Sequence, residues 1–474
     1  MNDITNSDIG NALIPSRRQI LKAISSGFGY LAFSSLATMA AADEKKQVTT
    51  GGPLAPKQPH FNARAKRVIF LCMRGGPSHV DTFDYKPQLA VDNGKLGKYG
   101  GSLLKSPWKF NQCGQSGLWI SELFPELGKQ ADEMCLLRGM NTDQPIHPRA
   151  LTQMHTGTSQ FIRPSLGAWT LYGLGSENDS LPGFISLNPP AGTAQNYGSA
   201  FLPAIYQGTK IGRSVGRLAQ RFGGGQSAAV PDARNRTWTS RQQRQQLDFI
   251  QQLNQQKLER DNQHPGVEGV IQSYELAFRM QDALPEVMDI SDESEHTKSL
   301  YGIGQQPTDG FGRQCLLARR LVESGVRFVE VTHGNWDHHA NLVTALPQRC
   351  SEIDQPIAGL LKDLKSRGML EDTLVVWSGE FGRTPAAQNR GGRDHNNRGY
   401  TSWMAGGGVQ GGLSYGATDE HGFEAVEGKC HIHDWHATIL HLLGLDHKEL
   451  TYRYAGRDFR LTDVYGNVLT DIMA

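Results

Sequence analysis

Four short apolar runs constrain the fold of this chain more than any other feature. Each run is nearly continuous, as is typical of a strand buried on both faces of a sheet. Each precedes a turn and polar residues. The runs are Val68–Met73, Met134–Leu137, Val326–Val331 and Thr373–Trp377. Helical stretches are expected between them, over Leu118–Asp132, Gly312–Ser324 and Pro347–Arg367. Strands that alternate with helices predict an α/β fold with a largely parallel sheet and right-handed crossovers.

The first 64 residues are typical of an export signal and a linker. Paired Arg17 and Arg18 precede a weakly apolar run, Ala23–Ala40, which ends in small residues. This order predicts a twin-arginine signal over residues 1–42 and a polar linker over residues 43–64. The alternative is a chance arginine pair before an ordinary amphipathic helix. We expect a periplasmic or extracellular protein with no stable membrane span after signal removal, because the run is short and polar.

Charge and cysteine usage exclude some classes of protein. Lys and Arg number 48 against 47 Asp and Glu, so the basic excess of a typical nucleic-acid binder is missing. The six cysteines are scattered without the close pairs of a zinc knuckle. We expect them to be buried free thiols, with disulfides as the weaker alternative.

Side chains that can bind metal follow the predicted strands. In open α/β sheets, ligands gather beyond the carboxyl ends of the strands. A single His or Asp there more often caps a helix or closes a turn. Four clusters at the ends of one sheet instead predict a divalent-metal centre, with Zn, Mn, Ca or Mg as the ion. The candidate ligands are His79, Asp81, Asp337, His338, His339, Glu380, Asp394, His395 and His433.

Two further segments admit more than one interpretation. Arg383, Arg390, Arg393 and Arg398 lie among the candidate ligands, and their guanidinium groups match phosphate or sulfate oxygens. The alternative is a solvated basic loop. Residues 240–263 are rich in Gln and Arg with apolar residues at helical spacing, which predicts a surface helix within an insertion near residues 235–300. A coiled-coil partner surface is the weaker alternative.

Several motifs resemble a known family. GGPSHVDTFD, SGEFGRTP, RDHN, HDWHATILHLLGLDH and LTYRYAGRDFRLTDVYG are similar to the exported bacterial family DUF1501, which is placed in the alkaline phosphatase-like superfamily. The resemblance implies one domain over residues 65–474, with a central, largely parallel sheet sandwiched by helices. It also implies two divalent metals and hydrolysis or transfer of phosphate or sulfate esters. Anionic substrates, including sulfated or phosphorylated saccharides, are the expected partners.

The same resemblance leaves the nucleophile open. Sulfatases carry Cys or Ser in Cys/Ser-x-Pro-x-Arg, whereas the matching stretch here, Pro145–Arg149, has neither. Thr142, Ser78 or a metal-activated water is therefore expected to attack, with His147 as acid or base. Arg149 and Arg383 are expected to bind the anion. We therefore expect an ester hydrolase, and the alternative is a catalytically silent relative that binds a carbohydrate or a surface partner.

Overall fold

The computed structural model describes residues 52–190, 192–212, 238–260 and 265–474. The signal predicted for residues 1–42 and the first part of the predicted linker, residues 43–51, lie outside these ranges. The rest of the linker lies against the domain. The backbone N–H of His60 donates to Gly444 and that of Arg64 to Leu442, both over 2.9 Å.

One sheet of nine strands forms the centre of the protein. Eight strands follow the order β12-β4-β11-β8-β1-β7-β5-β6, and β15 also pairs with β4. Of the described strands in this sheet, only β11 is antiparallel to its neighbours, β4 and β8. The strands are β1 (Arg67–Met73), β4 (Met134–Asn141), β5 (Phe184–Leu187), β6 (Thr209–Ile211), β7 (Phe328–His333), β8 (Thr373–Ser378), β11 (Tyr400–Ala405), β12 (Leu413–Tyr415) and β15 (Cys430–His431). The predicted α/β class with a largely parallel sheet is confirmed.

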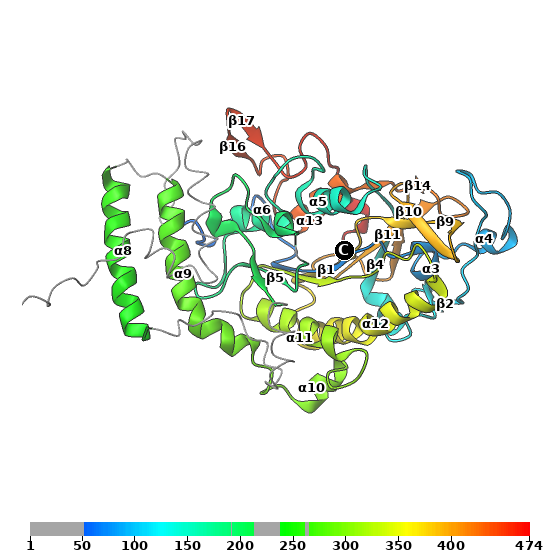
Figure 1. Cartoon of the computed structure of the whole chain (residues 1–474), viewed down its shortest axis with the longest axis horizontal. Helices are drawn as coiled ribbons and strands as arrows, with labels where there is room; N and C mark the ends of the chain where they lie inside the picture. Colours follow the sequence, from blue (N-terminus) through cyan, green and yellow to red (C-terminus); the bar gives the residue numbers. More distant parts are fainter. Residues whose placement is uncertain (1–51, 191, 213–237, 261–264) are drawn as a thin grey trace, which may run out of the picture.

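Helices cover both faces of the sheet (Figure 1). One face carries α11 (Asp309–Glu323) and α12 (Leu342–Ser366), and the other carries α5 (His147–Thr156), α6 (Leu166–Leu174) and α13 (Ile432–Leu442). Side chains of β1 alternate between the two layers. Ile69, Leu71 and Met73 pack with the α11 and α12 side. Val68, Phe70 and Cys72 pack with the α6 and α13 side. The sheet is therefore buried on both faces, which is why its strands are continuous apolar runs in the sequence.

The remaining elements are short or lie at the edges. The helices are α3 (His79–Thr82), α4 (Pro87–Val91) and α10 (Glu295–Leu300), with 3₁₀ turns at Leu127–Glu133, Ala194–Tyr197, Ala204–Tyr206 and Thr470–Ile472. The small hairpins are β2 (Phe110–Cys113) with β3 (Leu118–Ser121), β9 (Gly382–Gln388) with β10 (Gly392–Asn396), β13 (Ala417–Thr418) with β14 (Ala425–Glu427), and β16 (Tyr452–Tyr454) with β17 (Arg457–Phe459).

The helix predicted over Leu118–Asp132 is wrong. Its first residues form β3, where buried Leu118 and Ile120 alternate with exposed Trp119, a period that suits a strand. Pro125 lacks the N–H that a continuous helix needs at that point. A 3₁₀ turn follows, and the carboxylate of Asp354 accepts hydrogen bonds from the backbone N–H groups of Glu126 and Leu127. The predicted helices that begin near residues 312 and 347 are present as α11 and α12.

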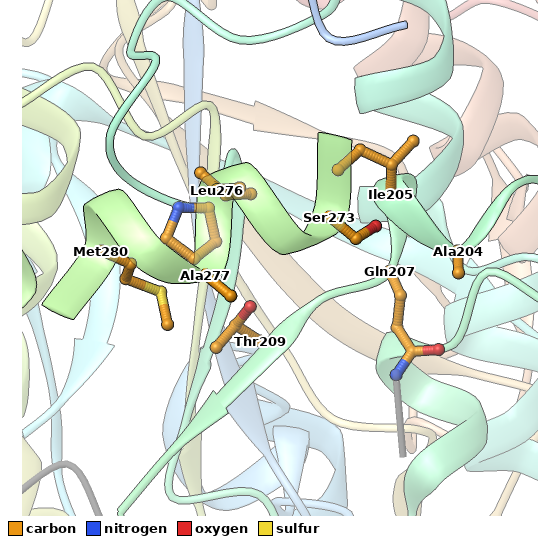
Figure 2. A pocket seen from close by; sticks show the side chains of 9 residues that line it. Ala204, Ile205, Gln207, Thr209, Ser273, Leu276, Ala277 and Met280 are labelled. Atoms are coloured by element: carbon orange, nitrogen blue, oxygen red, sulfur yellow. The ribbon is translucent and has the colours of Figure 1, made fainter. Parts of the chain in front are cut away.

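The Gln-rich segment forms α8 (Ser240–Arg260), which pairs with α9 (Pro265–Met288) at one end of the molecule (Figure 1). Arg244 on α8 donates two hydrogen bonds of 2.8 Å to Glu275 on α9. Figure 2 shows Leu276, Ala277 and Met280 of α9 beside the segment that contains Ile205 and Thr209. The small pocket between them has no titratable lining residue, so it adds no candidate chemistry.

Two expectations about the whole chain can be compared with the described residues. All six cysteines lie within them and are free thiols, five of them buried, so the expectation of free thiols is confirmed. In the described ranges, no helix combines the length and apolar character that crossing a membrane requires.

Candidate metal centre

Four side chains from three separate segments converge beyond the carboxyl end of β7. His147 begins α5, Asp337 and His339 lie in the loop between β7 and α12, and His395 lies on β10. One ligand atom from each side chain lies within 4.8 Å of the others. We call these four residues the candidate metal centre. All four were candidates from the sequence, His147 as an acid or base and the other three as ligands.

The four groups meet at one carboxylate oxygen. Oδ1 of Asp337 lies 2.9 Å from Nε2 of His339, 3.2 Å from Nε2 of His147 and 3.4 Å from Nε2 of His395. The Nε2 atoms of His339 and His395 are 2.9 Å apart. Three imidazoles thus direct the same ring nitrogen toward one acid.

The other ring nitrogen of each imidazole faces an oxygen acceptor. Nδ1 lies 2.6 Å from Oε1 of Glu380 in His147, 2.6 Å from Oε1 of Gln388 in His339, and 2.7 Å from the carbonyl oxygen of Pro145 in His395. Because a carboxylate or carbonyl oxygen can only accept, each Nδ1 carries the proton and donates it. Nε2 is then the ring nitrogen through which each imidazole could bind a metal ion once it carries no proton.

This arrangement fits a divalent cation. Three ring nitrogens and a carboxylate oxygen face one point, and with the ring nitrogens unprotonated these groups would attract a divalent cation. Imidazole-rich sites suit Zn²⁺ and related transition metals, whereas Ca²⁺ and Mg²⁺ prefer oxygen ligands throughout.

The charges around the centre hold Asp337 ionised and His395 neutral. Burial opposes ionisation of Asp337, but the hydrogen bond and charge of Arg383 outweigh it and hold its pKa well below the usual range. Burial, followed by the charge of Arg383, lowers the pKa of His395. Burial alone would also lower the pKa of His147, but the hydrogen bond to Glu380 and its charge raise it. Charged Asp337 and neutral His395 are the forms that bind a metal.

Glu380 holds His147 in place through a hydrogen bond to its Nδ1. Its carboxylate is buried, and both oxygens accept from the backbone N–H of Gly75, at 3.0 and 3.1 Å. Gly75 ends the turn after β1 with φ +118°, and a Cβ there would lie 2.7 Å from the backbone nitrogen of Asp337. Only glycine therefore allows β1 and the Asp337 loop to approach this closely. Glu380 was predicted as a ligand, but it contacts Nδ1 of His147 instead of belonging to the four-residue centre.

Arg383 supports the loops around the centre and is fully buried. Its Nε donates to Gly76 over 2.9 Å, its Nη1 to Arg393 over 3.2 Å, and its Nη2 to Gly75 and, over 2.6 Å, to Asp337. Every nitrogen of this guanidinium thus serves the protein itself, whereas the sequence suggested an anion-binding role. Arg149 is exposed on the first turn of α5.

Two other predicted ligands lie outside the centre, after β1. Asp81 forms a fully buried ion pair with Arg393, with Nε 2.6 Å from Oδ2, and it also accepts from the hydroxyl of Ser78 over 2.5 Å. Nε2 of His79 lies 2.9 Å from the carbonyl oxygen of Gly422. The sequence could not show that Asp81 already has a cationic partner 312 residues away.

The remaining predicted residues do not belong to the four-residue centre. His338 is buried, and burial lowers its pKa to about 4. His433 stacks on Tyr465 with ring centroids 5.2 Å apart, and burial lowers its pKa to about 4. Asp394 is exposed, with Oδ1 3.8 Å from Nδ1 of His339. The hydroxyl of Thr142 donates to Gln153 over 3.0 Å.

Sequence reasoning missed the groups that orient the imidazoles. Gln388 and the carbonyl of Pro145 fix the tautomers of His339 and His395, but neither has a signal in the sequence, because a glutamine or a backbone carbonyl has no recognisable spacing to its histidine. The pairing of β9 with β10 positions one of these groups, Gln388, and one of these histidines, His395. It places Gln388 opposite Gly392, and His395 opposite Arg383.

Comparisons with known proteins place the chain in a family and give distant structural similarities. The family described as "Protein of unknown function (DUF1501)" matches residues 65–473. No curated protein matches the chain significantly. Among solved structures, the lipoteichoic acid synthase LtaP from Listeria monocytogenes is 9% identical, covering 87% of this chain and 78% of its own, with a TM-score of 0.39.

Two further solved structures are similarly remote. The PsFucS1 sulfatase from Pseudoalteromonas sp. is 12% identical, covering 91% of this chain and 72% of its own, with a TM-score of 0.32. The alkaline phosphatase from the Antarctic bacterium TAB5 is 11% identical, covering 76% of this chain and 94% of its own, with a TM-score of 0.30. At these TM-scores, the similarities say nothing about the activity of this chain.

Proposed function

The chain belongs to the DUF1501 family, and from the geometry of its candidate metal centre we propose that it is a metal-dependent hydrolase of phosphate or sulfate esters. The observation that carries this proposal is the convergence of three Nε2 atoms on Oδ1 of Asp337. Each imidazole is fixed from behind by an oxygen acceptor, so the ligands are already oriented.

The centre is open to solvent on one side, as a catalytic site must be. The side chain of Asp337 is 43% exposed and that of His339 34% exposed, whereas Glu380 behind them is buried. Structural metal sites are closed, whereas catalytic sites keep a position for water or substrate. A bound divalent cation would polarise an ester oxygen and lower the pKa of water, supplying a nucleophile without a side chain.

The protein's own groups position the anion and the ligands. Arg149 is exposed two residues after His147 on the first turn of α5, where its guanidinium can pair with phosphate or sulfate oxygens. The N-terminus of α5 also favours negative charge. Buried Arg383 keeps Asp337 ionised and in place. We propose an exported enzyme, on the twin-arginine pattern of residues 1–42, with anionic esters that include sulfated or phosphorylated saccharides.

The test combines elemental analysis with turnover. Full-length protein purified without added metal is analysed for bound metals and assayed on a panel of chromogenic phosphate and sulfate esters. His339→Ala and His395→Ala should each lower both bound metal and turnover. His421→Ala is the matched control, because His421 pairs with Asp92 at 2.8 Å outside the centre. Unchanged metal content in both centre variants contradicts the proposal.

A catalytically silent binding protein is the second candidate. One observation favours it: among the described residues of the predicted nucleophile region, Thr142 donates its hydroxyl to Gln153, and the stretch 145–149 has neither Cys nor Ser. Bound metal without turnover on any ester of the panel would support this second function.

A further inference from the structure

A second group of metal-type side chains lies in the core, on the α5 side of the sheet. Cys72 comes from β1, Glu330 from β7 and His155 from the last turns of α5. All three are buried, and one ligand atom of each lies within 4.8 Å of the other two. We call these residues the buried triad. It shares no residue with the candidate metal centre, and none of its members follows a strand end.

His155 is oriented as a metal ligand. Its Nδ1 lies 2.8 Å from the carbonyl oxygen of Leu151, one turn earlier in α5, so Nδ1 carries a proton and donates it. Its Nε2 faces the triad and lies 3.3 Å from Oε1 of Glu330. A backbone carbonyl that fixes the outer nitrogen is the usual support behind a metal-binding histidine.

Glu330 supplies an independent sign that a ligand is required. It is 1% exposed, and its Oε1 accepts from the hydroxyl of Thr332 over 3.2 Å. Its Oε2 is buried and has no hydrogen-bond partner among the residues that the structure describes. Burying a carboxylate oxygen without a partner is costly, and native proteins seldom leave such an atom unsatisfied.

We propose that Cys72, His155 and Glu330 bind a second metal ion, a structural Zn²⁺, inside the core. Thiolate, imidazole and carboxylate are the three ligand types that zinc takes in proteins, and ligands around tetrahedral zinc lie roughly 3–4 Å apart. Zinc takes four ligands. Ser186, the neighbour of Glu330 in register on β5, has a buried hydroxyl without a hydrogen-bond partner among the described residues.

The ligand charges suit a buried dication. Zinc binds cysteine as the thiolate, histidine as neutral imidazole and glutamate as the carboxylate. Two negative ligands around one Zn²⁺ leave the buried triad without net charge, so the core would hold no uncompensated ion. The proton of the Cys72 thiol passes to solvent when the ion binds.

Cobalt substitution tests the proposal through a signal that only Cys72 can give. The holoprotein is stripped and reloaded with Co²⁺, and its near-ultraviolet absorption is recorded for thiolate-to-cobalt charge transfer. Wild type should show this band and Cys72→Ser should lose it. Cys135→Ser is the matched control, because Cys135 is equally buried on β4 in the same core and should leave the band unchanged. A wild type without the band, or a band that survives in Cys72→Ser, overturns the proposal.

A second variant covers the case in which Cys72→Ser does not fold. Glu330→Gln keeps the shape of the side chain and removes its charge, and it should lose one equivalent of bound metal by elemental analysis. Full metal content in Glu330→Gln overturns the proposal. His339→Ala should keep the thiolate band while it loses metal from the candidate metal centre. The thiolate band tests the zinc proposal, and the metal content of the candidate metal centre tests the hydrolase proposal. Failure of one proposal can therefore be distinguished from failure of the other.

Discussion

Nδ1 of His147 lies 2.6 Å from Oε1 of Glu380, although 233 residues separate them. This contact ties the first residue of α5 to the loop after β8. Because Glu380 also accepts from the backbone N–H of Gly75, it joins three segments under the candidate metal centre.

The first prediction follows from that contact. Glu380→Gln should weaken metal affinity about 10- to 100-fold, since a carboxylate behind a histidine raises its basicity and fixes its tautomer. Competition with a metal-sensitive chelating dye measures the change. Glu352→Gln is the control, because Glu352 pairs with His333 at 2.9 Å outside the centre. Equal affinities for the two variants would show that Glu380 does not support the metal.

Asp81→Asn should destabilise the protein without removing metal. The substitution leaves the fully buried Arg393 without its counter-charge, which costs about 3–5 kcal/mol of unfolding free energy. Urea denaturation measures the loss, and elemental analysis of the folded protein measures metal content. A variant of normal stability that lacks metal would instead make Asp81 a ligand.

Removal of metal should lower stability. An ion that binds only the folded state adds about 2.7 kcal/mol at a free concentration 100 times its dissociation constant. The unfolding free energy should therefore fall on dialysis against a chelator and recover when Zn²⁺ is returned. Identical unfolding curves before and after dialysis would mean that no ion contributes.

Asp354 should make stability depend on pH between about 4 and 6. Burial raises the pKa of this carboxyl to about 6 in the folded protein, against 3.8 for the ordinary group, despite hydrogen bonds from Glu126 and Leu127 that lower it. The folded state therefore holds the proton more tightly. The contribution, about 3 kcal/mol, is complete below the unfolded pKa and is lost as pH rises through about 6.

The variant Asp354→Asn removes this titration. Its unfolding free energy relative to wild type should rise as the pH increases over that range, measured by urea denaturation at intervals of one pH unit. A constant difference between the two proteins across the range would contradict the assignment.

Gly392→Ala should displace His339 and weaken metal binding. A Cβ at residue 392 would lie 2.1 Å from the backbone carbonyl carbon of His339, so the loop must move. Gly334→Ala is the control, because a Cβ there meets nothing within 4 Å. Isothermal titration with Zn²⁺ compares the two variants, and equal affinities would contradict the expected displacement.

The strands could be predicted because strands buried on both faces are continuous apolar runs, and β1, β4, β7 and β8 all lie where such runs occur. The error over Leu118–Asp132 arose because β3 is short and is followed by a turn that Asp354 caps from a distant helix. No local pattern reports such a cap.

The candidate site was predictable only in part. Asp337, His339 and His395 stand out because they follow predicted strands, and parallel strands end at one edge of the sheet. Asp81 has the same position, but its ion pair with Arg393 depends on the tertiary fold. Cys72 and Glu330 were hidden for a different reason. They lie within runs that look apolar, so a polar ligand there resembles ordinary strand sequence.

Helix α5 carries one histidine of each group, His147 at its first residue and His155 eight residues later, which is about 12 Å along the axis. The same ten-residue helix therefore carries a histidine to the solvent-facing centre at its first turn and another into the core at its last turn. The two groups share no residue, yet this single helix fixes the spacing between them.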